Sequence, residues 1–252
     1  MNSKDENGTH DPARAGTVSG RRKSAASRLH PASRADWDLT IREAVRLQRE
    51  LAGEVRIEPL PKDVRYVAGA DVSIGRASNK LIAGLVLWDL QCHKVVEQAV
   101  VRAETEFPYV PGLLSFREAP AVLAAFQKLR RRPDAAMFDG QGYAHPRRFG
   151  LACHLGVLLD IPSVGCAKSR LIGTYREPGK DRGRWSKLLD GGEVIGAVLR
   201  TRDGVRPLYI SVGHRADLCS SIDLVLRCAT RYRLPEPTRL AHQLVTVEKA
   251  RV

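Results

Sequence analysis

Three acidic side chains occupy positions where an ionised carboxyl group is costly unless it has a partner. Asp71 lies within an apolar, strand-like run at residues 67–73, and Asp139 directly follows a second apolar run at residues 135–138. Burial of a carboxylate is unfavourable unless it is paired or bound to a metal ion. If the two runs are neighbouring strands, Asp71 and Asp139 meet, and Glu118 provides a third acid nearby. Such oxygen ligands suit Mg²⁺ or Mn²⁺, which could orient a water molecule for attack on a phosphodiester.

Each of these acids also has a plainer interpretation. Asp71 could point to solvent on an alternating strand, Asp139-Gly140 is a common turn pair, and Glu118 could be an ordinary acid near a helix N-terminus. Spacing alone does not decide between a metal site and these alternatives.

The segment at residues 108–112 has an unusual composition. Pro108 and Pro111 stiffen the backbone on either side of Tyr109-Val110, so the tyrosine ring can be held out on a turn. A rigid aromatic ring could wedge into a stack of bases, which is useful where a distorted nucleic acid is then held. The alternative is a tyrosine that packs on its own turn.

The elements that must position these residues alternate between strand and helix. Three strand-like runs at residues 65–73, 81–90 and 94–101 predict an antiparallel meander. Strands at 135–138 and 163–167 alternate with helices at 115–131 and 147–159, which predicts parallel crossovers. The remaining expected elements are helices at 37–54, 217–231 and 238–250, and a hairpin of 193–200 with 208–212. We therefore expect an α/β, ribonuclease H-like mixed sheet, in which parallel strands extend the meander and helices flank the sheet.

Charge and composition narrow the classes of protein. The 252 residues include 41 Lys or Arg against 28 Asp or Glu, a formal net charge of +13. Such a surplus attracts polyanions, of which nucleic acid is the commonest. Apolar runs fall far short of the roughly 20 residues of a membrane span, and the polar opening predicts no secretory signal. Five cysteines without a C-x-x-C pair argue against disulfides or a cysteine zinc site. We expect a cytoplasmic monomer that does not associate with membranes.

Six ordered motifs resemble those of the endonuclease V family. They are GADVS at residues 69–73, PYVPGLLSFRE at 108–118, DGQG at 139–142, HPRR at 145–148, CAKS at 166–169 and PEPTRLAH at 235–242. The resemblance runs from about Asp38 to the C-terminus. It implies a ribonuclease H-like fold and a DNA-repair endonuclease that nicks DNA on the 3′ side of deoxyinosine, at the second phosphodiester bond from the lesion. It also implies Mg²⁺ as cofactor, with Mn²⁺ as a substitute.

The same resemblance implies roles for individual residues. Asp71 and Asp139 match the metal-binding carboxylates, and Glu118 matches the third active-site acid. Lys168 and His242 match a catalytic cation and histidine. The implied DNA-binding residues are Tyr109 as the wedge, its neighbours Pro108, Pro111 and Gly112, the glycines Gly140 and Gly142 around the extruded base, and His145 and Arg147. His214 we interpret as a structural histidine.

Domain limits follow from composition. Residues 1–36 have almost no large apolar side chains and contain the basic cluster Arg21-Arg22-Lys23, so they cannot offset the entropy of ordering. We expect a disordered basic N-terminal extension at 1–36 and an endonuclease V catalytic domain at 37–252.

Two other functions stay open at this point. One is a ribonuclease that cleaves inosine-containing RNA with the same site, because the contacts to the 2′-hydroxyl that separate DNA from RNA are not visible in a sequence. The other is a non-catalytic binder of damaged or branched nucleic acid. A pure binder would have no reason to keep three costly acids together, which argues against it.

Overall fold

The computed structural model describes residues 37–74 and 79–251, so the extension expected at residues 1–36 lies outside the described part. The strands in this part are β1 Tyr66–Ile74, β2 Lys80–Asp89, β3 Lys94–Glu104, β4 Ala135–Phe138, β5 Ser163–Ala167, β6 Trp185–Asp190, β7 Glu193–Leu199 and β8 Leu208–Val212. The helices are α1 Ile41–Ala52, α2 Leu114–Gln127, α3 Leu151–Leu159, α4 Leu218–Cys228 and α5 Glu236–Ala250.

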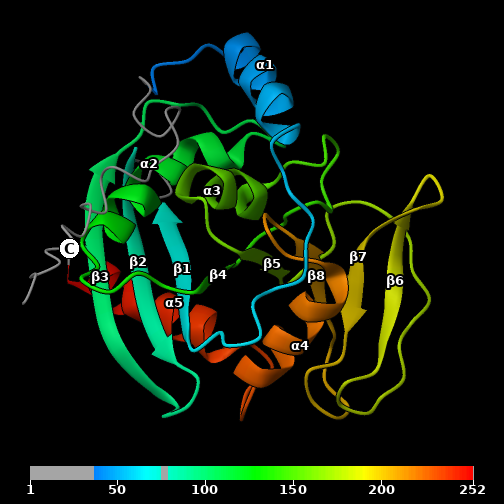
Figure 1. Cartoon of the computed structure of the whole chain (residues 1–252). Helices are drawn as coiled ribbons and strands as arrows, with labels where there is room; N and C mark the ends of the chain where they lie inside the picture. The colour runs from blue at the N-terminus through cyan, green and yellow to red at the C-terminus, as the bar shows by residue number, and fades with distance from the viewer. Residues whose placement is uncertain (1–36, 75–78, 252) are drawn as a thin grey trace, which may run out of the picture.

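All of these strands form one mixed sheet in the order β3-β2-β1-β4-β5-β8-β7-β6 (Figure 1). β1, β4 and β5 are parallel at its centre. β2 and β3 add the predicted antiparallel meander on one side, and β8, β7 and β6 add antiparallel strands on the other. The predicted ribonuclease H-like mixed sheet is therefore confirmed.

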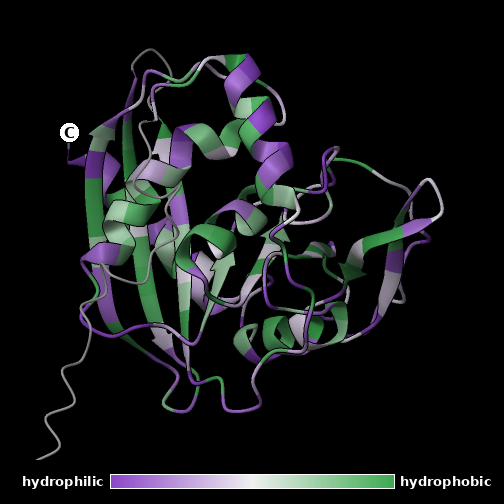
Figure 2. Ribbon diagram, turned by 45° about the horizontal axis from the view of Figure 1, so that its top comes forward, coloured by the Kyte–Doolittle hydropathy of each residue, from purple (hydrophilic) through white to green (hydrophobic). Residues whose placement is uncertain are grey.

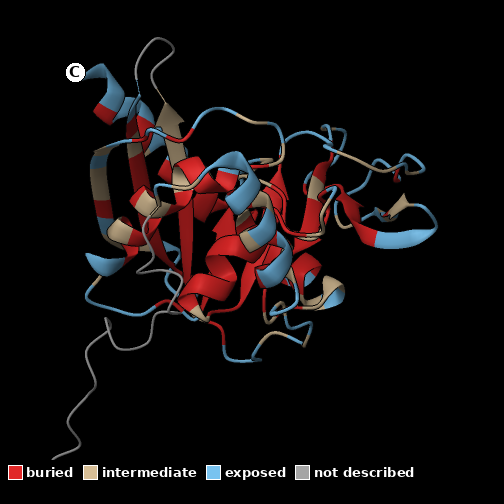
Figure 3. Ribbon diagram, turned by 90° about the horizontal axis from the view of Figure 1, so that it is seen from above, coloured by how far each residue is buried: buried red, intermediate tan, exposed pale blue. Residues whose placement is uncertain are grey.

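Side-chain alternation along the central strands builds a core on each face of the sheet. Ala68 and Ala70 of β1 pack in a cluster with α2 and α3, whereas Val67 packs in a second cluster with α4. The central strands are accordingly both hydrophobic and buried (Figures 2 and 3). α1 lies outside α2 and α3, while α5 covers the opposite face of β1 and β2 (Figure 1).

The structure differs from the sequence predictions in one strand and at several helix ends, such as those of α1 and α2. β6 was not predicted, because its residues mix polar and apolar types without alternation; it forms by pairing with β7 across Gly191-Gly192, both of which have positive φ. The helix expected from residue 147 begins only at Leu151, because residues 143–149 form turns instead. Among the described residues, no helix combines the length and the apolar character needed to cross a membrane.

Candidate active site

Asp71 and Asp139 come together because β1 and β4 are adjacent, parallel and in register. Ala70 pairs with Phe138, so the next residue on each strand, Asp71 and Asp139, lies beside the other where β4 ends. Their side chains are only 15% and 16% exposed. By the alternation of side chains along a strand, Asp71 and Asp139 lie on the same face of the sheet as Val67 and Met137, which pack in the core beneath α4 and α5. The adjacency on which the sequence interpretation depended is confirmed.

Two glycines allow α5 to approach this pair. A Cβ atom on Gly69 would lie 2.1 Å from the carbonyl carbon of Pro237, and one on Gly84 would lie 2.5 Å from Cγ2 of Val245. Only glycine fits such contacts, so α5 lies directly on β1 and β2. The approach places Nδ1 of His242 2.8 Å from Oδ2 of Asp71. The motifs at residues 69–73 and 235–242 therefore form one unit.

The second carboxylate has a cationic partner. Lys168 follows β5, the next strand in the sheet, and its Nζ contacts Oδ2 of Asp139. Asp71 thus faces His242 from one side of the pair, while Asp139 faces Lys168 from the other. Two exposed groups, one basic and one able to move a proton, therefore flank the two largely buried acids.

Glu118 brings a third acid to the same place from α2. Burial, together with the negative charges of Asp71 and Asp139, raises the pKa of Glu118 to about 8 against the opposing charge of Arg117. Burial also raises the pKa of Asp71; the hydrogen bond with His242 opposes this shift, and the charge of Asp139 adds to it. A divalent cation would be strongly favoured at this site, because it would stabilise the ionised forms of Asp71 and Glu118, which burial disfavours.

The donor chemistry fits a metal ion. Within residues 37–74 and 79–251, no three His, Cys, Asp or Glu side chains are arranged as a complete ligand set. Asp71 and Asp139 instead face His242 and Lys168. Carboxylate oxygens are nevertheless the ligands that Mg²⁺ and Mn²⁺ prefer. Asp71 and Asp139, with Glu118, are therefore the groups that would hold such an ion.

A cavity of about 400 Å³ opens beside Asp139. Its walls are the loop at residues 109–112, the turn at 139–141 and the segment 167–171. This volume falls within the range of small-ligand sites. The structure thus places a pocket next to the acids, on the side of β4 where Lys168 lies.

Tyr109 stands at the rim of this cavity with 70% of its surface exposed. The neighbouring Phe107 is buried and stacks on Phe116 of α2, with ring centroids 5.7 Å apart. The loop is therefore anchored through Phe107, which leaves the Tyr109 ring pointing away from the core.

Gln48 of α1, which the sequence interpretation missed, joins the cavity walls. Its buried amide donates to the carbonyl oxygens of Gly112 (3.0 Å) and Phe149 (2.8 Å), and its Oε1 accepts from Arg147. Arg147 also donates to the Gly112 oxygen at 2.7 Å. Gly112 has φ +80°, and a Cβ there would lie 2.7 Å from the Arg147 guanidinium. The only signal in the sequence was a polar residue on the apolar face of a helix.

The other predicted DNA-binding residues fall into two groups. Pro111, Gly112, Gly140 and His145 line the cavity. Pro108 lines a neighbouring cleft, and Gly142 faces away, since a Cβ there would lie 2.0 Å from the carbonyl oxygen of Val212.

His145 is held in its neutral form. Burial lowers the pKa of His145 to about 4, and the positive charge of Arg147 contributes. A neutral imidazole at physiological pH can donate or accept one hydrogen bond at the cavity, but it adds no charge toward a phosphate. Arg147 is the charged member of this pair.

Comparison with known proteins identifies the family. The sequence profile of endonuclease V matches residues 49–243. The chain belongs to the endonuclease V family. Endonuclease V of Methanothrix thermoacetophila is 49% identical over 216 residues, which cover 86% of this chain and 95% of that protein.

Solved structures of endonuclease V share the fold. That of Streptomyces avermitilis matches with a TM-score of 0.82 at 43% identity, covering 86% of this chain and 96% of the other. A Ciona intestinalis variant, in complex with a 23mer DNA containing an inosine followed by a ribo-adenosine, matches with a TM-score of 0.75 at 26% identity, covering 84% and 97%. The family resemblance of the motifs is thereby confirmed, and the chain is a nuclease.

Proposed function

We propose that this endonuclease V nicks DNA on the 3′ side of deoxyinosine, at the second phosphodiester bond from the lesion, by metal-assisted hydrolysis. The observation that carries the proposal is the adjacency of Asp71 and Asp139 on paired strands, directly beside a cavity with Tyr109 at its rim. The Ciona relative in complex with inosine-containing DNA supports the same substrate class.

Cleavage by this site needs no protein nucleophile. A Mg²⁺ ion, or Mn²⁺ in its place, held by Asp71 and Asp139 with Glu118 nearby, would lower the pKa of water and offset phosphate charge. Lys168 stands beside Asp139 and can neutralise a phosphate oxygen. His242 hydrogen-bonds Asp71 while half of its ring stays exposed, so its other nitrogen can exchange a proton with solvent or a leaving oxygen.

The cavity accounts for recognition of the damaged base. An extruded base would enter between the loop at 109–112 and the segment 167–171, while the Tyr109 ring fills the space left in the stack. Extrusion costs a few kcal/mol and less for a weakly paired base. Hypoxanthine would therefore be selected in part by the ease with which it leaves the duplex.

Inosine-containing RNA is the second candidate substrate. The nucleic acid bound to the Ciona relative has a ribo-adenosine directly after the inosine, so a site of this architecture accommodates a 2′-hydroxyl at that position. Cleavage of matched inosine-containing DNA and RNA, side by side with Mg²⁺, decides which substrate this chain prefers.

Substitution of the strand acids tests the proposal. Asp71→Asn and Asp139→Asn should abolish nicking of an inosine duplex with Mg²⁺, as should EDTA with the wild-type protein. Binding of the uncleaved duplex should persist, and at low salt it should strengthen, because one repulsive charge is removed. Asp223→Asn, which removes an exposed acid of α4, is the matched control and should nick normally. Undiminished nicking by either strand variant, or in EDTA, would falsify the proposal.

A further inference from the structure

One side of the active site carries a marked surplus of positive charge. By register, Ala167 pairs with Tyr209, Leu199 with Leu208, and Trp185 with Leu199. The end of β5, the start of β8, the end of β7 and the start of β6 therefore lie in a row along the edge where β4 ends. The loops at residues 168–184 and 200–207 emerge from this row. We call them, together with the adjoining loop at 229–235, the basic edge.

The composition of the basic edge is strongly one-sided. Its three loops contain eleven Lys or Arg against three Asp or Glu. Arg176, Lys180, Arg202 and Arg206 are all exposed, and among the described residues they form no ion pair. Their charge is therefore available to a ligand.

Hydrogen bonds join the loops into one surface. The amide of Gly204 donates to the carbonyl of Lys180 at 2.9 Å, and that of Gly183 donates to the carbonyl of Arg200 at 2.8 Å. The guanidinium of Arg233 reaches the carbonyl oxygen of Lys168 at 3.1 Å. The basic edge thus includes Lys168, the residue that contacts Asp139.

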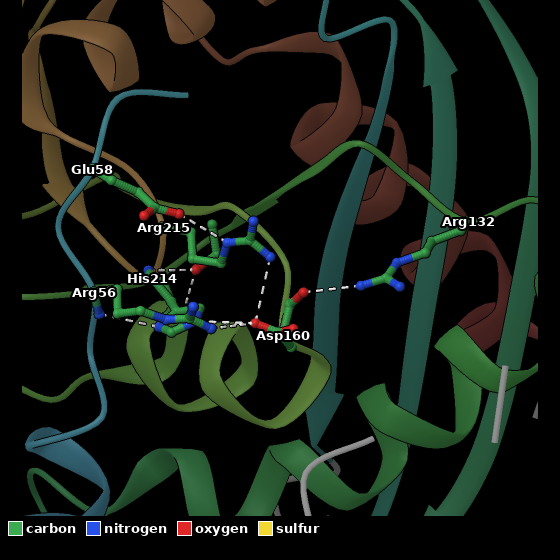
Figure 4. Close-up of polar contacts among 8 residues, drawn as sticks. Arg56, Glu58, Arg132, Asp160, His214 and Arg215 are labelled. Carbon is green, nitrogen blue, oxygen red and sulfur yellow. Dashed lines mark hydrogen bonds and ion pairs between the residues drawn. The ribbon is translucent and has the colours of Figure 1, made fainter. Parts of the chain in front are cut away.

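The opposite edge of the sheet shows the contrast. There, where β4 and β5 begin, Asp160 accepts from Arg56 at 2.8 Å and from Arg132 through its carbonyl oxygen at 2.9 Å (Figure 4). Arg215 donates to Glu58 at 2.9 Å and lies 3.5 Å from Asp160. His214, interpreted above as structural, is buried in this cluster. Arg56 and Arg215 are thus neutralised by acids, whereas the four exposed cations of the basic edge named above form no ion pair among the described residues.

The other flank of the active site carries charges of both signs. β3 ends at Glu104, which pairs with Lys80 at the start of β2, on the same edge of the sheet as Asp71 and Asp139. Both Glu104 and the nearby Glu106 are exposed. A polyanion placed across the active site would therefore be attracted more strongly on the side of β8, β7 and β6 than on the side of β3.

We propose that the basic edge binds the phosphate backbone of the duplex on one flank of the lesion. The inference rests on the proposed function, because the lesion fixes the duplex at the acids. From β4 to β6 the sheet advances four strand spacings, about 19 Å at roughly 4.8 Å each. Phosphates of one strand follow each other by about 3.4 Å, so the surface reaches about six base pairs from the scissile bond.

A triple substitution tests the proposal by binding in EDTA, where no cleavage is expected. Lys180→Ala/Arg202→Ala/Arg206→Ala removes three exposed charges of the basic edge. Lys62→Ala/Lys94→Ala/Arg130→Ala removes three exposed charges from the opposite edge and is the matched control. With an inosine duplex that extends well beyond about six base pairs on both sides, the first variant should bind at least about tenfold more weakly. The slope of log affinity against log salt should become shallower by about one unit for each phosphate that the variant no longer neutralises. The control should bind as the wild type does.

Shortened duplexes test the one-sidedness. Two duplexes are compared, one cut to about three base pairs on the 5′ side of inosine and the other cut to about three base pairs on the 3′ side. Both shortened flanks are shorter than the reach of the basic edge. We expect the wild type to bind these two duplexes with unequal affinity. The triple variant should bind both equally. Equal binding by the wild type, or an unchanged salt slope in the triple variant, would overturn the proposal.

The two proposals fail in different ways. If the basic edge is irrelevant, the triple variant binds like its control while the wild type still nicks inosine substrates. If the proposed function is wrong, the wild type itself does not nick them. Equal melting temperatures of the two triple variants and the wild type verify that these exposed substitutions leave the fold intact.

Discussion

At the scale of single residues, the site is a set of opposed charges in a tight space. Asp71 with His242 and Asp139 with Lys168 are contacts across elements far apart in the chain. The acids could be predicted because a carboxylate in an apolar strand is costly and therefore conspicuous. Gln48 could not, because its role depends on backbone carbonyls of Gly112 and Phe149 that only the folded chain brings to it. Buried polar groups of this kind are satisfied by tertiary contacts that a sequence does not display.

Tyr109→Ala separates a wedge from a core residue. Because the ring is 70% exposed, its removal should leave the melting temperature nearly unchanged. The preference for inosine over adenosine substrates should fall, since a ring in the base stack contributes about 1–3 kcal/mol. Tyr109→Phe should keep most of the preference, because stacking uses the ring face. The measurements are thermal unfolding and the ratio of cleavage rates on the two substrates.

The control for this test lies two residues away. Phe107→Ala removes a buried ring that stacks on Phe116 and should lower stability by about 3–5 kcal/mol. A Tyr109→Ala protein that melts early, yet selects inosine normally while folded, would show that Tyr109 is structural and not a wedge.

At the scale of elements, strands and helices were predicted correctly where the sequence had a clear hydrophobic period. They were missed where a segment becomes a strand only by pairing with a neighbouring strand. The meander, the parallel strands β4 and β5, and the hairpin of β7 with β8 were predicted and are confirmed. β6 was missed, because Trp185–Asp190 has no alternation of its own and becomes a strand through β7. The turn that replaces the first residues of the predicted helix at 147–159 is set by contacts of Arg147 with Gln48 and Gly112.

The packing of α5 on β1 provides the test at this scale. Gly69→Ala would place a methyl carbon 2.1 Å from the backbone of Pro237. That atom cannot yield as a flexible side chain can, so α5 must shift at its N-terminal end. We expect stability to fall by roughly 2–4 kcal/mol, in the range of severe overpacking. Nicking should fall as well, because His242 moves away from Asp71 with its helix.

Gly53→Ala is the matched control for this helix contact. Gly53 has φ −69°, in the right-handed helical region, and its added carbon would be 3.4 Å from the nearest backbone oxygen. The protein should be as stable as the wild type or slightly more stable, since an alanine loses less backbone freedom on folding. Equal unfolding curves for Gly69→Ala and Gly53→Ala would contradict the close approach of α5.

At the scale of the whole molecule, charge is divided between the two edges of the sheet. The net charge of +13 indicates a polyanionic partner but not where it binds. The location follows only from topology, which gathers loops distant in sequence at the edge beside Asp139, where Arg176, Arg202 and Arg206 are exposed. At the opposite edge, Asp160 and Glu58 neutralise Arg56 and Arg215 (Figure 4). Strand order, not composition, thus decides which surface is positive.

Global stability should decrease in acid through a histidine buried on α3. His154 lies among the rings of Phe116, Phe149 and Trp37, at 4.8, 5.3 and 5.8 Å, and its Nδ1 is 2.9 Å from Oγ of Ser115. Burial lowers the pKa of His154 to about 3 from the ordinary 6.5. Below pH 6.5 the unfolded chain therefore binds a proton at His154 that the folded protein does not bind. The free energy of unfolding consequently falls as the pH drops toward about 3.

His154→Phe should remove this part of the pH dependence. The variant lacks the hydrogen bond to Ser115 at every pH, so near neutrality it should be somewhat less stable than the wild type. Below pH 6.5 the difference should shift in favour of the variant by about 1.4 kcal/mol per pH unit, because only the wild type must keep a neutral imidazole against protonation. Denaturant unfolding at a series of pH values measures the shift.

His93→Asn, at an exposed histidine with φ +48°, serves as the control, since a ring already in solvent changes its surroundings little on unfolding. If the free energy of unfolding depended on pH in the same way for His154→Phe and the wild type, His154 would be protonated as readily in the folded protein as in the unfolded chain.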